Sequence, residues 1–347
     1  MNPEADGHMS GAKRATIVVT PREQFSKARR SLESILAHTD PSVPLVYVDG
    51  NSPPALARYL QQQAARHGFT LLRTEHYLAA NEARNLALPR TQTKYVVFVD
   101  NDVSVSAGWF EKLIACAEET GAWAVGPLYL IDDPAKQLIH TVGADLKIIE
   151  EDGVRRLHER HLFSHQPVSK VKDQLVRRPI DLVEFHCMLV RRDALDRLGP
   201  LDEGLISFFD HIDFCLQVAQ AGGTIFSEPT AVVTHLAPPP FSWSDLPCFF
   251  LRWSDAWMKP SITRFAQKHR LDLDDEDFRG HRRYRDGHRL RLLGRARGML
   301  RRIAGQRGSA MTERLFSDVL FGRLVERTIV NKLERQRASA NSRPARA

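Results

Sequence analysis

The chain has 347 residues, of which 43% are hydrophobic and 26% charged, and its formal net charge is +7. This length is enough for one large α/β domain and an appendage. No apolar run approaches the roughly 18 residues that span a bilayer, which excludes an ordinary transmembrane helix.

The four cysteines lie far apart in apolar contexts and form no Cys-x-x-Cys pair: Cys116, Cys187, Cys215, Cys248. This pattern favours buried thiols in a reducing cytoplasm over disulfides or a zinc site. Residues 1–13 are polar and lack the apolar centre of a signal peptide, so we expect a disordered N-terminal tail. The protein is therefore predicted to be cytoplasmic.

The N-terminal part of the chain alternates two kinds of segment. Runs of β-branched and aromatic residues predict strands at 15–20, 44–48, 70–73 and 95–99. Helices are predicted between them, at 28–36, 55–66 and 81–85. Strands that alternate with helices imply a parallel, doubly wound α/β sheet.

Polar residues suited to a nucleotide follow three of these strands: Thr20-Pro21-Arg22, Asp49, and Asp100-Asn101-Asp102. In an open α/β sheet, ligands bind at the carboxyl ends of the strands. Asp100 and Asp102 repel each other unless a cation lies between them, and such a cation would bridge to a phosphate-bearing substrate. The alternative is an ordinary loop in which one Asp caps the next helix, with Ser104 or Ser106 as competing caps.

The middle segment, residues 127–180, is predicted to lie over the ligand-binding edge of the sheet. Its charged stretch from Glu150 to Lys172 has the composition of a solvated, mobile excursion, and loops over a site often carry function. Three aromatic residues are candidates for contact with a ligand: Trp109, Trp123, His186. For each of them, packing in the core or on the surface is the alternative.

The C-terminal region is strongly basic. Residues 279–347 contain 19 Lys and Arg against 5 Asp and Glu, a net +14, whereas the remainder contains 30 against 37, a net −7. Basic helices with an apolar stripe suit an anionic membrane surface, and solvated helix faces are the alternative. Residues 311–337 could instead dock on the preceding domain or pair with a second subunit. No nucleic-acid-binding module is recognisable, so specific nucleic-acid binding is rejected.

An ordered set of motifs resembles family 2 glycosyltransferases, whose fold is called GT-A. The set spans residues 14–237: Thr20-Pro21-Arg22, Asp49-Gly50-Asn51-Ser52, the segments 81–85, 95–102, 188–203 and 208–217, Ala221-Gly222-Gly223, and Val232-Val233-Thr234-His235. The resemblance implies a mixed, doubly wound GT-A domain at 14–270 and a helical basic appendage at 271–347.

The resemblance implies that the middle segment, residues 127–180, provides acceptor specificity, and that the three aromatic candidates would stack on a sugar or contact the acceptor.

The resemblance also implies roles for the motif residues. Asp49 would accept hydrogen bonds from a nucleotide base, uracil, although it could simply be a turn residue. Arg84 would lie near the nucleotide or its phosphates, with a solvated helix residue as the alternative. Asp102 and His235 would bind Mn²⁺ or Mg²⁺. The other donor-side residues would be Thr20, Pro21, Arg22, Asn81, Asn101, and Asp100, which would contact ribose or metal-bound water.

The chain departs from the family where the general base is expected. The family's usual aspartate falls on His211, and Asp210 takes the preceding glutamate position. Either Asp210 is the base with help from His211, or His211 takes the proton while Asp210 orients its ring. Imidazole suits proton transfer near neutral pH, so the exchange need not abolish activity.

The predicted function is metal-dependent, inverting transfer of a sugar from a nucleotide-sugar, a UDP-sugar, to a hydroxyl of a glycan or lipid-linked acceptor. The enzyme would be cytoplasmic and peripheral on the inner face of the membrane through residues 279–347. The alternative function is a noncatalytic nucleotide- or sugar-binding scaffold that its basic tail holds at a membrane.

Overall fold

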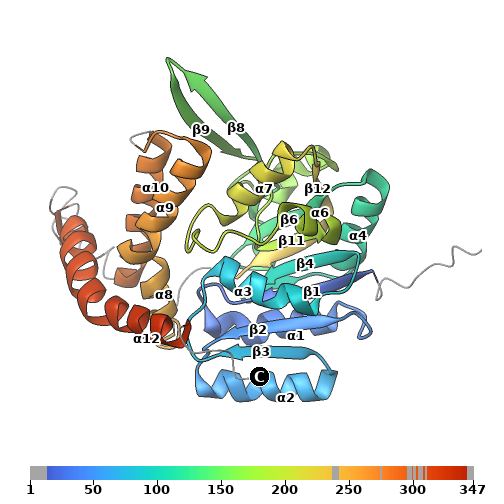
Figure 1. The fold of residues 1–347 in the computed structure, drawn as a ribbon, viewed down its shortest axis with the longest axis horizontal. Helices are drawn as coiled ribbons and strands as arrows, with labels where there is room; N and C mark the ends of the chain where they lie inside the picture. Colours follow the sequence, from blue (N-terminus) through green and yellow to red (C-terminus); the bar gives the residue numbers. More distant parts are fainter. Residues whose placement is uncertain are drawn as a thin grey trace, which may run out of the picture.

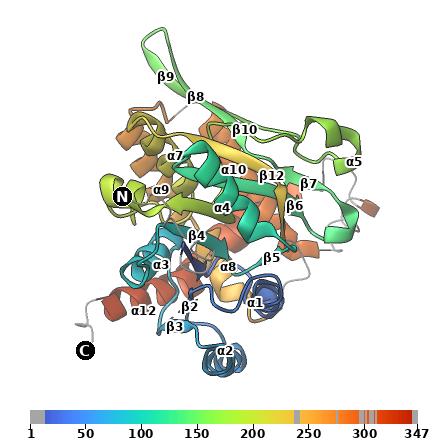
Figure 2. The same cartoon turned by 90° about the vertical axis from the view of Figure 1, so that its right-hand side faces the viewer.

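The computed structural model describes residues 14–236, 242–273, 276–294 and 311–341, together with residues 299, 302, 303 and 308. The predicted tail at 1–13 lies outside these ranges. The described residues form a mixed sheet of 10 strands in the order β10-β12-β6-β11-β4-β1-β2-β3, with β5 paired to β12 and β7 to β6 (Figures 1 and 2). Its strands are β1 (Ala15–Thr20), β2 (Leu45–Gly50), β3 (Thr70–Thr74), β4 (Tyr95–Asp100), β5 (Val103–Val105), β6 (Ala124–Ile131), β7 (Ile139–Thr141), β10 (Arg178–Pro179), β11 (Cys187–Arg191) and β12 (Ile225–His235).

The sheet contains both parallel and antiparallel pairs. Strands β3, β2, β1 and β4 are parallel, β11 runs antiparallel to β4 and β6, and β12 is parallel to β6. Because β11 is reversed, the residues that precede it lie at the same edge as the carboxyl ends of the parallel strands. Several distant segments of the chain therefore meet at one edge.

The central strands are buried on both faces. Every residue of β4 is buried, and its side chains alternate between two core clusters. Val96 and Phe98 join one cluster, whereas Val97 and Val99 join the other. Helices on both faces complete these clusters, as a doubly wound sheet requires.

The helices follow the sequence prediction closely in the N-terminal part. The α-helices are α1 (Ala28–Ala37), α2 (Pro54–His67), α3 (Ala80–Ala87), α4 (Trp109–Thr120), α5 (Val168–Val171), α6 (Arg192–Leu198), α7 (Asp210–Gln220), α8 (Leu246–Arg252), α9 (Asp255–His269), α10 (Glu276–Arg289) and α12 (Asn331–Asn341). Short 3-10 helices are η2 (Phe25–Lys27), η3 (Leu88–Arg90), η4 (Pro134–Lys136), η5 (Lys172–Gln174) and η6 (Leu290–Leu293), and η7 (Phe316–Val330) is a π-helix. The predicted α/β class, a doubly wound mixed sheet with a helical C-terminal region, is confirmed.

The structure after β4 contradicts the alternative in which Asp100 or Asp102 caps the next helix. Asp102 is followed by the strand β5, which contains Ser104, and the next helix begins only at Trp109 after Gly108. Asp102 therefore caps no helix. Pairing of β5 with β12 instead places Val103 opposite His235.

The middle segment is more ordered than predicted. Much of the stretch expected to be a solvated, mobile excursion forms a separate two-stranded hairpin of β8 (Ala144–Glu151) and β9 (Val154–His161). Figure 2 shows this hairpin projecting from the body of the molecule. Cross-strand ion pairs such as Arg156 with Glu151, 3.0 Å apart, replace a loop of solvated charges.

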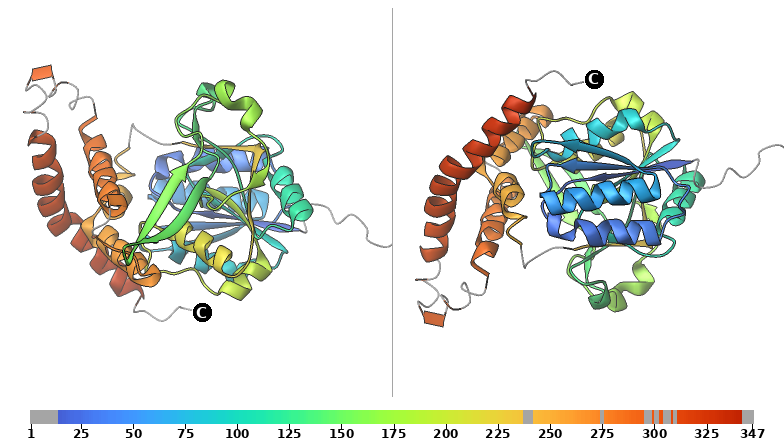
Figure 3. Two further views of the ribbon diagram at one scale, coloured as in Figure 1. Left: turned by 90° about the horizontal axis from the view of Figure 1, so that it is seen from above. Right: turned by 90° about the horizontal axis from the view of Figure 1, so that it is seen from below.

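The C-terminal helices pack along one side of the sheet domain (Figures 1 and 3). Phe278 of α10 and Phe321 of η7 belong to the core cluster that also contains Phe265 of α9. Arg337 Nη2 of α12 lies 2.8 Å from Glu82 Oε2 of α3. The docking alternative for residues 311–337 is therefore confirmed, whereas the domain boundary at 270 remains a prediction.

Two composition-based predictions can be compared with the structure. All four cysteines are buried and unpaired, which confirms the expected thiols. Among the described residues, no helix combines the length and the apolar character that crossing a membrane requires.

Candidate active site

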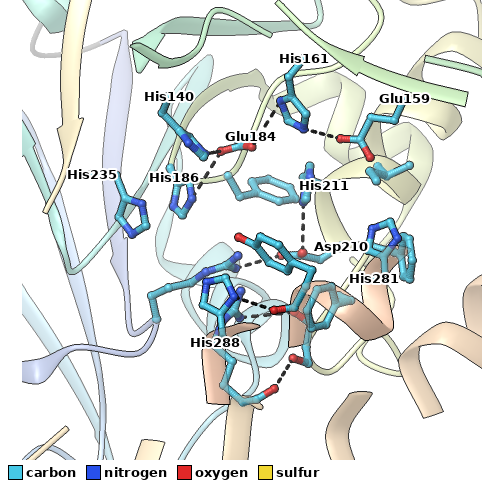
Figure 4. Close-up of a pocket in the computed structure, with 18 of the residues that line it drawn as sticks. His140, Glu159, His161, Glu184, His186, Asp210, His211, His235, His281 and His288 are labelled. Atoms are coloured by element: carbon cyan, nitrogen blue, oxygen red, sulfur yellow. Dashed lines mark hydrogen bonds and ion pairs between the residues drawn. The ribbon is translucent and has the colours of Figure 1, made fainter. Parts of the chain in front are cut away.

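A cavity of about 550 Å³ opens beside the carboxyl ends of β1 and β12 (Figure 4). Its lining includes eight of the chain's 14 histidines: His140, His161, His165, His186, His211, His235, His281, His288. Helix α10 and the residue that follows it by two positions, Arg291, form part of the wall. The cavity thus joins the predicted donor edge of the sheet to the basic C-terminal region.

The loop after β1 and the loop after β4 hold each other at this edge. Thr20 pairs with Asp100 in the parallel register of β1 and β4. The backbone N–H of Asn101 donates to Thr20 O at 2.9 Å, and the N–H of Arg22 donates to Asn101 Oδ1 at 3.0 Å. Pro21 packs close to Gly50, where an added Cβ would lie 3.1 Å from Pro21 Cγ. The predicted residues of these two loops are therefore brought together.

Asp100 is a buried carboxylate surrounded by nitrogen atoms. Arg22 Nε lies 3.5 Å from Oδ2 and Arg84 Nη2 lies 3.6 Å from Oδ1, while His186 Nδ1 is 2.8 Å from Oδ2. Burial raises the pKa of Asp100, but the charge of Arg22 and the hydrogen bond to His186 outweigh burial and keep the pKa below its ordinary value. Asp100 is therefore ionised and fixes the orientation of His186.

Arg84 is the arginine of α3, and its side chain is completely buried. The alternative of a solvated helix residue is therefore wrong. Its Nη1 donates to Asp210 Oδ2 at 2.6 Å and to Asn81 Oδ1 at 2.9 Å, and Asn81 donates to Asp202 O at 2.9 Å. Neither Arg84 nor Asn81 lines the cavity. Both support Asp210 from behind, and their predicted contact with a donor remains a prediction.

Asp210 and His211 begin helix α7 and differ sharply in their surroundings. Asp210 is only 2% exposed and is paired with Arg84 and with Arg22, whose Nη1 lies 3.6 Å from Oδ2. Burial raises the pKa of Asp210, but Arg84 outweighs this effect and holds the pKa well below its ordinary value. His211 lines the cavity, with Nδ1 3.4 Å from Asp210 Oδ1. Both residues line the cavity, Asp210 as an ionised carboxylate paired with two arginines and His211 as a more exposed imidazole.

Asp102 and His235 form a buried pair that lacks hydrogen bonds. His235 Nε2 lies 3.7 Å from Asp102 Oδ2, too far for a hydrogen bond. Both carboxylate oxygens of Asp102 and both ring nitrogens of His235 are buried without a hydrogen-bond partner. Leaving such groups unsatisfied costs about 1–3 kcal/mol each, so the donor set fits a divalent cation held between them.

A second group of possible ligands lies next to this pair. His186 stacks on His235 with ring centroids 4.1 Å apart, and His186 Nε2 lies 3.4 Å from Glu184 Oε2. His140 Nε2 of β7 is 3.1 Å from the same oxygen. Burial raises the pKa of Glu184, but His140 and the other nearby histidines keep it well below its ordinary value. Two neighbouring sets of nitrogen and oxygen ligands therefore lie at the cavity, although Asp102 of the first set is buried behind its lining.

Asp49 lies away from this cavity, at the end of β2. Its two carboxylate oxygens accept hydrogen bonds from the N–H and the hydroxyl of Ser52, each at 2.9 Å, and Arg73 forms an ion pair with it. Asp49 is not among the residues that line the cavity. It is held in a turn and an ion pair, and its role in reading a nucleotide base stays a prediction.

Only one of the three aromatic candidates for substrate contact reaches the cavity. His186 lines it, whereas Trp109 is fully buried and donates from Nε1 to Thr39 Oγ1 at 3.2 Å. Trp123 packs over Gly223 and contacts Arg197, also away from the cavity. The packing alternative is therefore correct for both tryptophans.

Several cavity residues were missed in the sequence. Glu184 lies three residues before β11 and two before the predicted His186, and this position near a strand end was an available signal. His140 lies on β7, which pairs with β6, and His161 lies on β9, which pairs with β8. The sequence pattern did not reveal either of these strand pairs. The residues of α10 lie far along the chain in a segment predicted to be a separate appendage, so no local signal connects them with the site.

Comparison with known proteins finds a glycosyltransferase family and several relatives, most of which carry glycosyltransferase names. The family model of glycosyl transferase family 2 matches residues 16–199, more than half of the chain. An uncharacterized protein of Sinorhizobium fredii is 26% identical over 233 residues, which cover 65% of this chain and 25% of that protein. Mouse polypeptide N-acetylgalactosaminyltransferase 12 is 24% identical over 263 residues, covering 71% of this chain and 44% of that protein.

A solved structure of GalNAc-T7 with UDP, GalNAc and Mn²⁺ is similar at 17% identity with a TM-score of 0.48, over 69% of this chain and 48% of that one. The chain spans only 25% and 44% of the lengths of the two curated relatives. The extent of the family match is decisive: the chain belongs to glycosyl transferase family 2.

Proposed function

We propose that this protein is an inverting, metal-dependent glycosyltransferase that moves a sugar from a UDP-sugar to a hydroxyl of a glycan or lipid-linked acceptor. The observation that carries the proposal is the buried pair of Asp102 and His235, whose oxygen and nitrogen atoms have no hydrogen-bond partners. The pair lies at the edge of the sheet where Asp100 and Arg22 also converge.

Asp102 and His235 would hold the cation, and imidazole beside carboxylate favours Mn²⁺ over Mg²⁺. When bound, such an ion offsets the negative charge that builds on a departing nucleoside diphosphate. Arg22, which lines the cavity, adds a positive charge from the loop after β1. Asp100 keeps the guanidinium of Arg22 in place through their ion pair.

The general base in this proposal is His211. Asp210 is paired with two arginines that keep its pKa well below the ordinary value, and such a carboxylate accepts protons poorly. His211 faces the cavity and has Asp210 beside Nδ1, which can orient the ring. A proton from the attacking acceptor hydroxyl would pass to the other ring nitrogen, Nε2. Of the two readings that the sequence leaves open, the proposal adopts the one in which His211 takes the proton and Asp210 orients its ring.

The acceptor would bind on the side of the cavity whose wall is formed by α10. Tyr284 and His288 of α10 lie beside Phe208 and Trp253, and the rings of His288 and Trp253 stack with centroids 3.8 Å apart. Aromatic rings of this kind suit the apolar face of a sugar. An α10 in this position makes the C-terminal region part of the acceptor site.

The outer face of the C-terminal helices supports contact with an anionic membrane. Five apolar side chains are exposed there by 44–66%: Met311, Leu315, Val319, Leu320, Leu324. Arg314, Arg323 and Arg327 are exposed on the same segment. Apolar residues interleaved with arginines are typical of helices that lie on anionic lipid surfaces. A lipid-linked acceptor would be reached from such a position.

The proposal is tested by thermal unfolding of the full chain with a panel of nucleotides and nucleotide-sugars, each with and without Mn²⁺. A bound ligand raises the melting temperature according to its concentration relative to its dissociation constant. We expect a shift with uridine nucleotides that requires Mn²⁺, and turnover when an acceptor is supplied. No shift with any nucleotide would contradict the proposal, and binding without turnover would favour the scaffold alternative.

A further inference from the structure

We propose that His140, Glu184 and His186 form a second cation site, which binds a divalent transition metal such as Zn²⁺ beside the donor cation site of Asp102 and His235. The three side chains come from β7 and from the residues that precede β11. One ligand atom from each lies within 4.8 Å of the other two. All three residues line the cavity, so an ion here would be accessible from it.

The distances between the ligand atoms suit one ion. Glu184 Oε2 lies 3.1 Å from His140 Nε2 and 3.4 Å from His186 Nε2. Two ligands of a tetrahedral Zn²⁺, each about 2.0–2.1 Å from the ion, are roughly 3.3 Å apart. The three atoms can therefore converge on an ion with little movement. Two imidazoles and one carboxylate form a donor set that borderline metals such as Zn²⁺ and Co²⁺ prefer.

The orientation of His186 provides an independent observation. Its Nδ1 is 2.8 Å from the buried carboxylate of Asp100, which leaves Nε2 directed at Glu184. A carboxylate that accepts from the outer nitrogen of a histidine is the usual support of a metal-binding imidazole, because it fixes the tautomer and the ring orientation. A histidine that only lines the cavity would not need a buried carboxylate to hold its second ring nitrogen.

His161 lies next to the proposed site, but its two ring nitrogens have other partners. Its Nε2 lies 2.7 Å from Glu159 Oε1, and its Nδ1 lies 3.2 Å from Thr141 Oγ1. The approach of His161 to Glu184 is to the other oxygen, Oε1, at 4.0 Å. Oε2 of Glu184 therefore remains directed at His140 and His186.

His186 also belongs to the neighbouring group of Asp102 and His235. With Nδ1 engaged by Asp100, its single remaining nitrogen can bind only one of two adjacent ions, and Glu184 and His140 favour the second site. Three protein ligands leave at least one coordination position open. In the setting of the proposed function, on which this step rests, that position would take an oxygen atom of the acceptor.

The test uses the full chain, stripped of metal with a chelator, in an Asp102→Asn background that disables the donor cation site. Co²⁺ is titrated and followed by its visible absorption, and Zn²⁺ is measured by elemental analysis after equilibrium dialysis. His140→Ala and Glu184→Gln are added separately to this background. His158→Ala, an exposed histidine on β9, is the matched control, and thermal unfolding of each metal-free variant verifies folding.

We expect the Asp102→Asn protein and the His158→Ala control to bind one ion without UDP. His140→Ala and Glu184→Gln should each weaken this binding at least tenfold, because a directly bound ligand is lost. Folded His140→Ala or Glu184→Gln proteins that bind as tightly as their parent would overturn the proposal, as would an Asp102→Asn protein that binds no ion. If the wild-type protein shows no UDP-dependent binding of Mn²⁺, that result would contradict the proposed function but not the second cation site.

Discussion

The two sides of the cavity are built in different ways. On the proposed donor side, Arg22, Asp100 and Asp102 lie at the ends of strands that are neighbours in a buried sheet, so the register of β1 and β4 fixes their positions. On the opposite side, Tyr284 and His288 belong to α10, which is held beside the cavity by contacts with η7, by stacking of His288 on Trp253 and by the ion pair of Arg285 with Asp255 of α9. The first side depends on backbone pairing, and the second depends on helix docking.

Under the proposed function, this difference separates the side that carries the chemistry from the side that recognises the acceptor. The sheet edge presents charges whose spacing the backbone sets, which suits a fixed ion and a diphosphate. The docked helix presents aromatic rings and histidines on an element that can change without disturbing the sheet. Substitutions on the donor side should therefore abolish turnover, and substitutions on the helical side should alter stability, acceptor binding or membrane contact.

The largest effect is expected for Asp102→Asn. Removing one charge from the donor cation site should lower turnover by about 10³-fold, since the charge of the leaving group would lose its counter-ion. The measurement is the initial rate with a UDP-sugar at saturating Mn²⁺. Asp145→Asn, on the exposed hairpin, is the control. A rate within tenfold of the wild type would break the assignment of the donor side.

Substitutions at His211 should have the next largest effect and sharpen the identity of the base. His211→Ala should reduce turnover by about 10²-fold or more while UDP binding survives. His211→Asp should recover part of the rate with its acid limb moved to lower pH, because a carboxylate loses its proton at lower pH than an imidazole. An unchanged pH profile in His211→Asp would point to Asp210 instead.

Docking of α10 should depend on pH through His288. Burial against Trp253 and the charge of Arg291 lower the pKa of His288 to about 3, so the folded protein keeps this ring neutral. The unfolded chain takes up a proton below about pH 6.5, and stability is therefore lost as the pH falls from there toward 3. At pH 5 the loss is about 2 kcal/mol.

His288→Phe keeps a ring on Trp253 but cannot titrate, so it should remove this part of the pH dependence. Denaturant unfolding at pH 7 and pH 5 measures the difference, with His158→Ala as the exposed control. If the wild type and His288→Phe lose equal stability between the two pH values, the ring is not buried as described.

The smallest effect is expected at the outer face of the C-terminal helices. Leu315→Glu and Leu324→Glu should each weaken binding to phosphatidylserine vesicles about tenfold at low salt, because an exposed apolar contact is lost and a like charge is added. Val176→Glu, an equally exposed site in the middle segment, is the control. Vesicle binding that is unaffected by either leucine substitution would reject a membrane role for this face.

The sequence predicts correctly that Thr20 and Asp100 lie together at one edge of the sheet, because the information that it uses is local. Apolar runs that stop at Thr20 and Asp100 identify buried strands and the edge that they share, and the structure brings these residues together. Asp49 is the exception: it ends β2 as expected, but it is paired with Arg73 and Ser52 outside the cavity. The pattern of a strand end does not reveal which partner a carboxylate finds.

The opposite side could not be predicted because its contacts join distant segments. His140 meets Glu184 across 44 positions of sequence, and α10 packs beside residues more than 70 positions earlier, such as Phe208. The high content of arginine suggested a separate tail, yet Arg289 is 1% exposed and donates to Trp253 O at 2.8 Å. Charge composition therefore misleads where long side chains are buried in ion pairs.

The most direct test of the account is Mn²⁺ binding measured by electron paramagnetic resonance with and without UDP. We predict that UDP increases Mn²⁺ binding by the wild type and the His158→Ala control, and that Asp102→Asn and His235→Ala each lose this increase while remaining folded. A folded Asp102→Asn protein with the same UDP-dependent Mn²⁺ binding as the wild type would contradict the central claim that Asp102 and His235 hold the donor cation.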